Sequence, residues 1–177
     1  INVTGFTMRE TISFLLDKIK LKQQMFIITA NAEIIMLAQN DLEFKKIITE
    51  QADLVLPDGA GVVLAARHLG YQIPERVAGC DLVQNLLSEA AKIGLSVYFF
   101  GAAPTIAQQA SVFASKNNSG LKIAGVRDGF FQESEIPQII QEINNSKADM
   151  VFLALGVPKQ EKFINMYRSQ LNASLLM

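Results

Sequence analysis

The amino-acid sequence predicts one α/β domain over residues 1–177, with a Rossmann-like, mostly parallel sheet flanked by helices on both faces. Short apolar runs rich in β-branched residues alternate with segments of helical periodicity, as in chains that build parallel sheets. Several of these runs carry no charge, which is typical of strands covered on both faces. With 177 residues, half of them hydrophobic, the chain can bury a core without disulfide or metal crosslinks.

Local signals in the first half of the chain place its expected elements. Thr7 and Glu10 have the spacing of a capping box, ahead of apolar residues at helical intervals. The run from Ile1 is expected to lie within a strand. Strands are also expected at residues 25–28 and 53–56, and helices after Thr7, from about Glu33, from Asp41 as N-cap and over 61–69.

The second half continues the alternation after a loop at residues 71–79. Gly70 is expected to end the preceding helix, and Pro104 and Pro137 suit the first turns of later helices. Strands are expected at 95–100, 121–126, 150–155 and 173–177, and helices at 81–93, from 104, at 134–143 and at 158–168. Residues 93–115 carry no charge, but their Gly, Pro and Gln residues favour a strand, a turn and a helix over a membrane span.

Charge and cysteine content exclude several classes of protein. Sixteen basic and 17 acidic residues give a net charge of −1, which excludes a polycationic nucleic-acid binder and a charge-driven disordered chain. Cys80 is the only cysteine, so no intramolecular disulfide forms and a reducing cytoplasm is expected. Cys80 is interpreted as an ordinary buried thiol, and His68, near a helix end, as structural. No Asp-x-Asp pair is present, so a local motif for a divalent metal is missing.

Polar residues and glycines gather directly after the expected strands. In parallel sheets the carboxyl ends of the strands share one edge, where ligands bind. The residues that follow the strands and could contact a ligand there are Thr29, Asn31, Asp58, Gly101, Arg127, Lys159 and Gln160. This asymmetry predicts a small-molecule site at that edge.

Three of the candidates have a structural and a functional interpretation. Asp58 could cap a helix or accept a proton from a substrate hydroxyl, and the two roles are compatible. Arg76 could pair with Glu75 on a solvated loop or bind a phosphate. Lys159 opens a helix, where a cation is unfavourable for the helix dipole and so suggests a function with anions.

The glycines after residue 58 raise an alternative, a dinucleotide-dependent oxidoreductase. Gly59 and Gly61 match the start of the dinucleotide fingerprint, but Leu64 stands where its third glycine belongs. No acidic residue ends a strand about twenty residues further on, as that fingerprint requires. The match is therefore weak, although the alternative stays open.

Six motifs occur in order along nearly the whole chain. They are Thr29-Ala-Asn-Ala-Glu-Ile34, Leu56-Pro-Asp-Gly-Ala-Gly61, Pro74-Glu-Arg-Val-Ala-Gly-Cys-Asp81, Phe100-Gly-Ala102, Asp128-Gly-Phe-Phe131 and Ala154-Leu-Gly-Val-Pro-Lys-Gln-Glu161. Together they resemble the WecG/TagA/CpsF family of bacterial glycosyltransferases (glycosyltransferase family 26). The resemblance implies metal-independent, inverting transfer of an N-acetylmannosamine-type sugar from a UDP donor to polyprenyl-diphosphate-linked N-acetylglucosamine. The product would serve wall teichoic acid, common antigen or capsule synthesis.

The resemblance also implies roles for individual residues. Asp58 is expected to be the catalytic base, and Thr29 and Asn31 to position the acceptor sugar or orient that base. Arg76 and Gln160 are expected to contact substrate, and Lys159 the donor phosphate. Gly101 and Arg127 are candidates for the nucleotide site, and no cofactor or metal is implied.

Family members continue with a basic, partly amphipathic C-terminal segment that this chain is expected to lack. In the family that segment is thought to supply arginines for the diphosphate and to hold the enzyme on the inner face of the cell membrane. The resemblance thus implies a peripheral membrane protein and self-association. A non-catalytic UDP-sugar-binding fragment is the remaining alternative.

Overall fold

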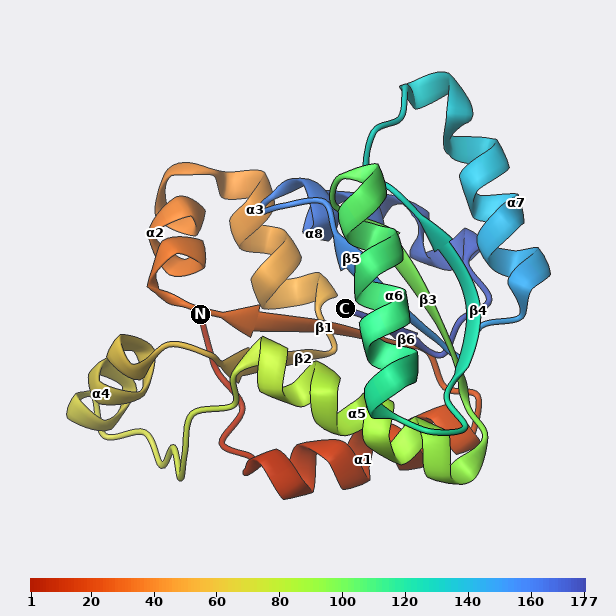
Figure 1. Cartoon of the computed structure of the whole chain (residues 1–177). Helices are drawn as coiled ribbons and strands as arrows, with labels where there is room; N and C mark the ends of the chain where they lie inside the picture. The colour runs from red at the N-terminus through yellow and green to blue at the C-terminus, as the bar shows by residue number, and fades with distance from the viewer.

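Six strands form one sheet in the computed structural model, which describes residues 1–177 (Figure 1). They are β1 (Met25–Ala30), β2 (Leu54–Pro57), β3 (Ser96–Gly101), β4 (Lys122–Arg127), β5 (Met150–Ala154) and β6 (Leu175–Leu176). Their order is β2-β1-β6-β5-β3-β4, and all five pairs of neighbours run parallel. The predicted α/β, Rossmann-like class is confirmed.

Of eight α-helices, one precedes β1 and seven connect the strands, close to the expected positions. They are α1 (Met8–Lys20), α2 (Ala32–Asn40), α3 (Leu42–Lys46), α4 (Ala60–His68), α5 (Gly79–Ile93), α6 (Pro104–Asn117), α7 (Ile136–Ser146) and α8 (Lys159–Tyr167). Short helices η1 (Ile47–Gln51), η2 (Glu133–Glu135) and η3 (Arg168–Gln170) extend α3, precede α7 and follow α8. The Thr7–Glu10 capping box is present, and Asp41 Oδ1 accepts a hydrogen bond from Phe44 N at 2.9 Å.

The expected strand at the N-terminus is wrong. Residues 1–7 form no regular element. One backbone hydrogen bond, from Thr4 N to the Val55 carbonyl oxygen at 2.7 Å, joins this segment to β2. A single bond does not make a ladder, and Val3 instead packs against the small cluster of Val63, Ala66 and Ile73.

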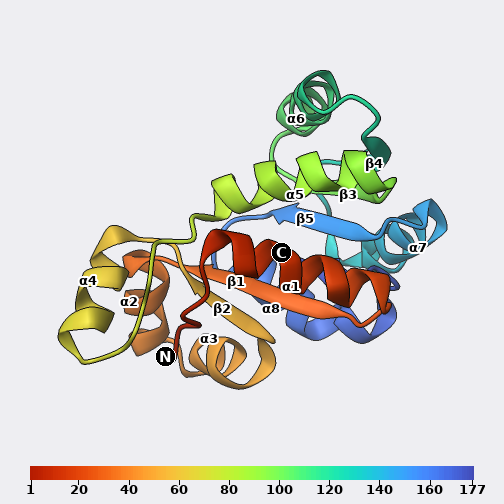
Figure 2. The same cartoon turned by 90° about the horizontal axis from the view of Figure 1, so that it is seen from below.

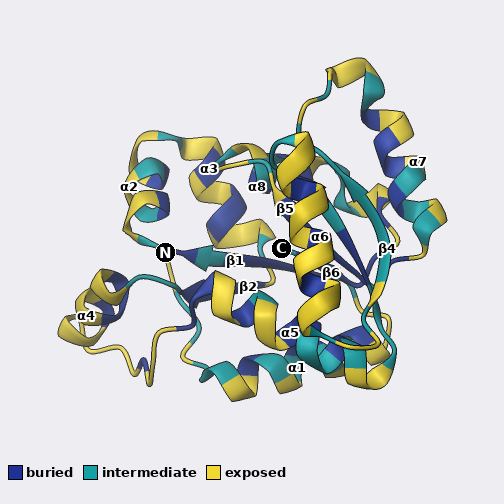
Figure 3. Ribbon diagram, in the orientation of Figure 1, coloured by how far each residue is buried: buried dark blue, intermediate teal, exposed yellow.

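Helices cover both faces of the sheet, as the uncharged strands require (Figure 2). Alternate residues of β1 point to opposite faces of the sheet. Phe26 and Ile28 belong to the core cluster formed with α2, α3, α7 and α8. Ile27 belongs to the cluster formed with α1 and α5. The strands other than β4 are mostly buried, the edge strand β4 is of intermediate burial, and many exposed residues lie on the outer sides of the helices (Figure 3). Burial of these apolar faces stabilises the sheet.

No helix has both the length and the apolar character that crossing a bilayer requires. The uncharged stretch 93–115 instead covers the end of α5, all of β3 and most of α6. The strand, turn and helix expected there are confirmed.

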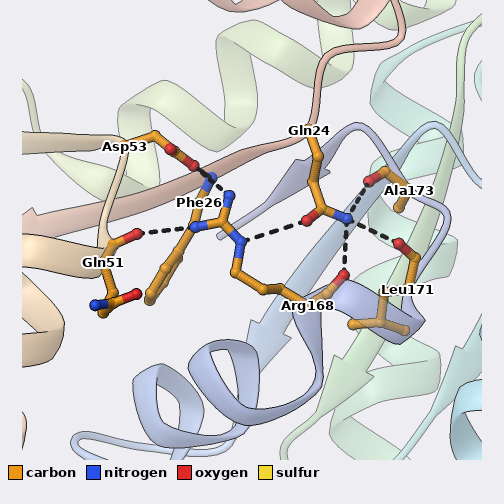
Figure 4. A network of polar contacts seen from close by, with 7 residues as sticks. All are labelled: Gln24, Phe26, Gln51, Asp53, Arg168, Leu171 and Ala173. Atoms are coloured by element: carbon orange, nitrogen blue, oxygen red, sulfur yellow. Dashed lines mark hydrogen bonds and ion pairs between the residues drawn. The ribbon is translucent and has the colours of Figure 1, made fainter.

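A polar network joins three segments at the amino end of the sheet (Figure 4). The Arg168 guanidinium donates to the Gln51 carbonyl oxygen at 2.8 Å and to Asp53 Oδ2 at 2.6 Å. Asp53 Oδ2 also accepts from Phe26 N at 2.7 Å, and Gln24 Nε2 donates to three carbonyl oxygens of residues 168–173. The network thus links β1, the start of β2 and the segment before β6, at the end of the sheet opposite the expected site.

A second polar group at the same end joins β3 to β5. Asp149 accepts hydrogen bonds from Ser96 N at 2.9 Å, Ser96 Oγ at 3.0 Å and Lys22 Nζ at 2.8 Å. Burial opposes ionisation of this carboxyl, but the bonds from Lys22 and Ser96 outweigh it and lower the pKa of Asp149.

Asp149→Asn should lower the free energy of unfolding by about 1–2 kcal/mol at neutral pH, because the charged acceptor is lost. Since folding lowers the pKa, the contribution is present above the unfolded value of about 4 and disappears as the pH falls through the folded value. Urea unfolding of both proteins between pH 7 and pH 2.5 should show the difference shrinking below pH 4. Asp17→Asn, an exposed carboxylate 3.6 Å from Lys20, is the control and should change stability little at any pH. A pH-independent difference for Asp149→Asn would contradict the assignment.

Candidate active site

A cavity of about 430 Å³, here cavity 1, opens at the carboxyl edge of the sheet between β1 and β5. β6 lies between these strands but pairs only with Met25 and Phe26 of β1 and with Met150 and Val151 of β5. Residues further along β1 and β5 line the cavity. It therefore lies beyond the end of β6, where β1 and β5 no longer have a strand between them. Polar residues in the lining include Thr29, Asn31, Asp58, Cys80, Gln160 and Glu161.

Asp58 follows β2 and is fixed at the cavity by two elements. Its backbone N donates to the Ala30 carbonyl oxygen at 3.0 Å, and its Oδ2 accepts a hydrogen bond from Gly79 N at 3.2 Å. Gly79 is the first residue of α5, so Asp58 bonds a free amide at the start of that helix. The interpretation of Asp58 as the N-cap of the helix that follows it is wrong. The N-cap of α4 is Gly59, which makes no side-chain bond.

Thr29 lies against Gly79, which explains why a glycine starts α5. A Cβ at Gly79 would stand 2.7 Å from Thr29 Oγ1, closer than side chains can approach. The start of α5 therefore packs directly on β1 and brings its first amide to Asp58. Because Gly79 has no side chain, α5 can start close enough to contact both Thr29 and Asp58.

Asn31 and Gln160 complete the set of predicted residues in cavity 1. Asn31 is the N-cap of α2, with Oδ1 accepting from Ile34 N at 2.9 Å. Its amide nitrogen takes no part in this cap and can still donate. Gln160 lies in the first turn of α8, on the β5 side of the cavity. The structure thus brings Thr29, Asn31, Asp58 and Gln160 together.

Glu161 is a cavity residue that sequence reasoning missed. Its side chain is 2% exposed, and its Oε2 is buried without a hydrogen-bond partner. Burial raises the pKa of Glu161, and weaker contacts with its own amide and the Gln160 side chain only partly offset this. In the sequence it is simply an acid in the first turn of a helix, a common surface position, so no local signal marks it.

A second cavity of about 760 Å³, here cavity 2, lies beside the ends of β3 and β5. Residues 102–103, 129–132 and 154–155 line it, together with Glu135 and Lys159. Lys159 Nζ lies 4.5 Å from the centre of the Phe131 ring. Gly101, at the end of β3, has φ +129°, and a Cβ there would collide with the backbone of Ala154. Only glycine therefore lets the turn after β3 approach β5 at the edge of this cavity.

The segment from Leu153 to Glu161 is the wall shared by the two cavities. Leu155 and Lys159 line cavity 2, whereas Val157 and Gln160 line cavity 1. The neighbours Lys159 and Gln160, which open α8, therefore serve different cavities.

Three predicted site residues, Gly101, Arg76 and Arg127, lie outside both cavity linings. Arg127 donates to Glu142 Oε2 at 2.7 Å and to Glu135 Oε1 at 3.1 Å, which ties β4 to η2 and α7. Arg76 lies on the loop before α5, with half of its side chain exposed and Nη2 3.5 Å from Asp81 Oδ2. Their contacts with substrate stay predictions.

Pairing of Arg76 with Glu75 is wrong, because the Glu75 carboxylate instead accepts a hydrogen bond from Met8 N at the start of α1. The prediction of a buried Cys80 is also wrong. Cys80 follows Gly79 in the first turn of α5, is exposed and lines cavity 1. The buried residues of α5, such as Leu82 and Leu86, occupy another side of the helix. His68 is the exposed last residue of α4.

The fold and site define an α/β protein with two neighbouring cavities at the carboxyl edge of a parallel sheet, one of them holding a carboxylate positioned by a helix start. The model of the glycosyl transferase WecG/TagA/CpsF family matches residues 1–177, and the chain belongs to this family.

Two curated relatives carry the name N-acetylglucosaminyldiphosphoundecaprenol N-acetyl-beta-D-mannosaminyltransferase. The protein from Bacillus spizizenii (strain ATCC 23059 / NRRL B-14472 / W23) is 37% identical over 143 residues, which cover 81% of this chain and 54% of the relative. The protein from Bacillus subtilis (strain 168) is 34% identical over 140 residues, 79% of this chain and 54% of the relative. The chain spans about half the length of the curated relatives it matches.

Proposed function

We propose that this chain is the core of an inverting glycosyltransferase. It would move an N-acetylmannosamine-type sugar from a UDP donor to polyprenyl-diphosphate-linked N-acetylglucosamine in cell-surface polysaccharide synthesis. Membership of the family and the names of two relatives support this activity. The observation that carries it is Asp58, placed with Thr29, Asn31 and Gln160 around one cavity at the sheet edge.

The reaction would be a single displacement at the anomeric carbon of the donor sugar. Asp58 takes the proton of the acceptor hydroxyl as that oxygen forms a bond to the anomeric carbon. The bond from this carbon to the UDP oxygen breaks at the same time, and UDP leaves with the electron pair. Thr29, Asn31 and Gln160 hold the acceptor sugar in line for attack.

The leaving nucleotide would occupy cavity 2. Lys159 suits a phosphate there, because a cation favours negative charge. The close turn after Gly101 supplies backbone groups at the same cavity. Arg76 would add a further cationic contact, and Arg127 would support the cavity through Glu135.

Transfer is tested with the whole protein that carries this chain, UDP-N-acetylmannosamine and a lipid-diphosphate N-acetylglucosamine acceptor. The expected product is the lipid-linked disaccharide with inverted anomeric configuration, formed equally well with a chelator present, since no metal is proposed. The same assay of residues 1–177 alone decides whether this core is active or only binds donor. Absence of product from the whole protein, with UDP and sugar binding intact, would contradict transfer.

Thermal stability separates transferase from oxidoreductase. UDP should raise the melting temperature of this chain, and NAD(H) should not, because ligands that bind only the folded state stabilise it. Stabilisation by NAD(H) alone would favour the dinucleotide alternative.

The exposed thiol of Cys80 reports which ligand enters cavity 1. A soluble acceptor analogue with an N-acetylglucosamine diphosphate group should slow alkylation of Cys80, whereas UDP alone should not. Protection of Cys80 by UDP and not by the acceptor analogue would instead assign the nucleotide to cavity 1 and the acceptor to cavity 2.

Association with the membrane surface and with a second copy of the chain are further proposals. Large apolar side chains are exposed on several helices, including Leu42, Leu64 and Phe113. Ultracentrifugation and flotation with vesicles of undecaprenyl-phosphate-containing anionic lipid test the two associations separately.

A further inference from the structure

The carboxyl group of Glu161 has no role in the chemistry described above. It is buried at the wall of cavity 1, in the first turn of α8, and its Oε2 has no donor within the protein. A buried carboxylate without donors is costly, so such a group is generally found with a partner.

The lysines on either side of Glu161 are engaged elsewhere. Lys159 lies over the Phe131 ring in cavity 2. Lys162 pairs with Asp41 Oδ2 at 2.9 Å and with Glu43 Oε2 at 2.8 Å. No ion pair of the chain includes Glu161. Oε2 is therefore available to a donor from whatever occupies the cavity, although the Glu161 amide and the Gln160 side chain contact the carboxyl group.

The neighbours of Glu161 identify that occupant. Asp58, Thr29, Asn31 and Gln160 line the same cavity, and under the proposed function they surround the sugar whose hydroxyl Asp58 deprotonates. A pyranose ring carries further hydroxyl groups, and these donate strongly to carboxylates. We infer that Glu161 is a sugar-binding residue whose carboxylate accepts a hydrogen bond from a non-reacting hydroxyl of the acceptor hexosamine. This inference rests on the proposed function.

Glu161 would thereby determine specificity for the acceptor sugar. A site that hydrogen-bonds a substrate hydroxyl discriminates against the analogue lacking it, because the buried partner is left unpaired. The donor nucleotide, in cavity 2, would not sense the change.

Kinetics of Glu161→Gln in the whole protein test the inference. The variant keeps the shape of the side chain but removes its charge, and should raise KM for the acceptor about 10-fold, the loss expected for a hydrogen bond to a charged group. Both kcat and KM for the UDP-sugar should stay within about threefold of wild type. Glu50→Gln, an exposed glutamate in η1, is the control and should change none of these constants.

A set of acceptors, each lacking one hydroxyl other than the reacting one, identifies the contact. Wild type should lose about 10-fold in kcat/KM on one analogue, and Glu161→Gln should show little further loss on it. A purely structural glutamate would not produce this coupling.

Each other outcome has a distinct meaning. An inactive wild-type protein would overturn the proposed function itself. An active wild type whose Glu161→Gln variant keeps the acceptor KM and the same analogue sensitivity would overturn the inference alone. A Glu161→Leu variant that loses stability while Glu161→Gln shows no coupling would also overturn it, and would assign the carboxyl group a structural role.

Discussion

Asp58→Asn should lower kcat for transfer by about 10³-fold, within the range that a positioned general base contributes. The amide keeps the shape of the side chain, and its oxygen can still accept the bond from Gly79 N, but it cannot take a proton. The measurement is transfer by the whole protein under saturating substrates, with UDP binding followed by calorimetry. UDP affinity and melting temperature should stay near the wild-type values.

Asp149→Asn is the matched control for this prediction. It makes the same chemical change at the opposite end of the sheet and costs stability, yet should leave transfer intact at 25 °C. If Asp58→Asn retained more than a tenth of the wild-type rate, another group would have to be the base.

Arg168→Ala should lower the free energy of unfolding by about 3 kcal/mol, because the substitution leaves Asp53 without its ion pair in a half-buried position. The bond to the Gln51 carbonyl oxygen and the contact with the Phe26 ring are lost as well. For a chain of this size the melting temperature should fall by roughly 5–10 °C, measured by calorimetry or circular dichroism.

Two variants check the origin of that loss. Arg168→Lys keeps the charge but cannot reach Gln51, Asp53 and Gln24 at once, and should lose about half as much stability. Arg9→Ala removes an exposed arginine of α1 and should change stability by less than about 0.5 kcal/mol. A loss below about 1 kcal/mol for Arg168→Ala would show that the network contributes little to the free energy of unfolding.

Much of the fold could be predicted because its signals are local. The uncharged strand runs, the Thr7–Glu10 capping box and the helix start at Asp41 each depend on residues within a few positions of one another. The carboxyl edge then follows from parallel strands alone, which is why Thr29, Asn31, Asp58 and Gln160 could be placed together before any coordinates.

What could not be predicted depends on contacts between distant segments. Asp58 bonds the helix that begins 21 residues later, and Arg168 bonds Asp53, directly before β2, from more than 110 residues away. The burial of Glu161 and the exposure of Cys80 could not be predicted either. The packing of whole helices buries the acid and exposes the thiol, against the usual preference of each residue type. Arg76 and Arg127 have the right chemistry for an anion but lie outside the cavity linings.

The wall between the two cavities has a thermodynamic consequence. Lys159 faces one cavity while its successors Gln160 and Glu161 face the other, and all three belong to a single helical turn. A ligand in cavity 2 that immobilises Lys159 also restricts the backbone that carries the two side chains lining cavity 1. Part of the entropy cost of ordering the second ligand is then met by the first, so each should tighten binding of the other by the same factor.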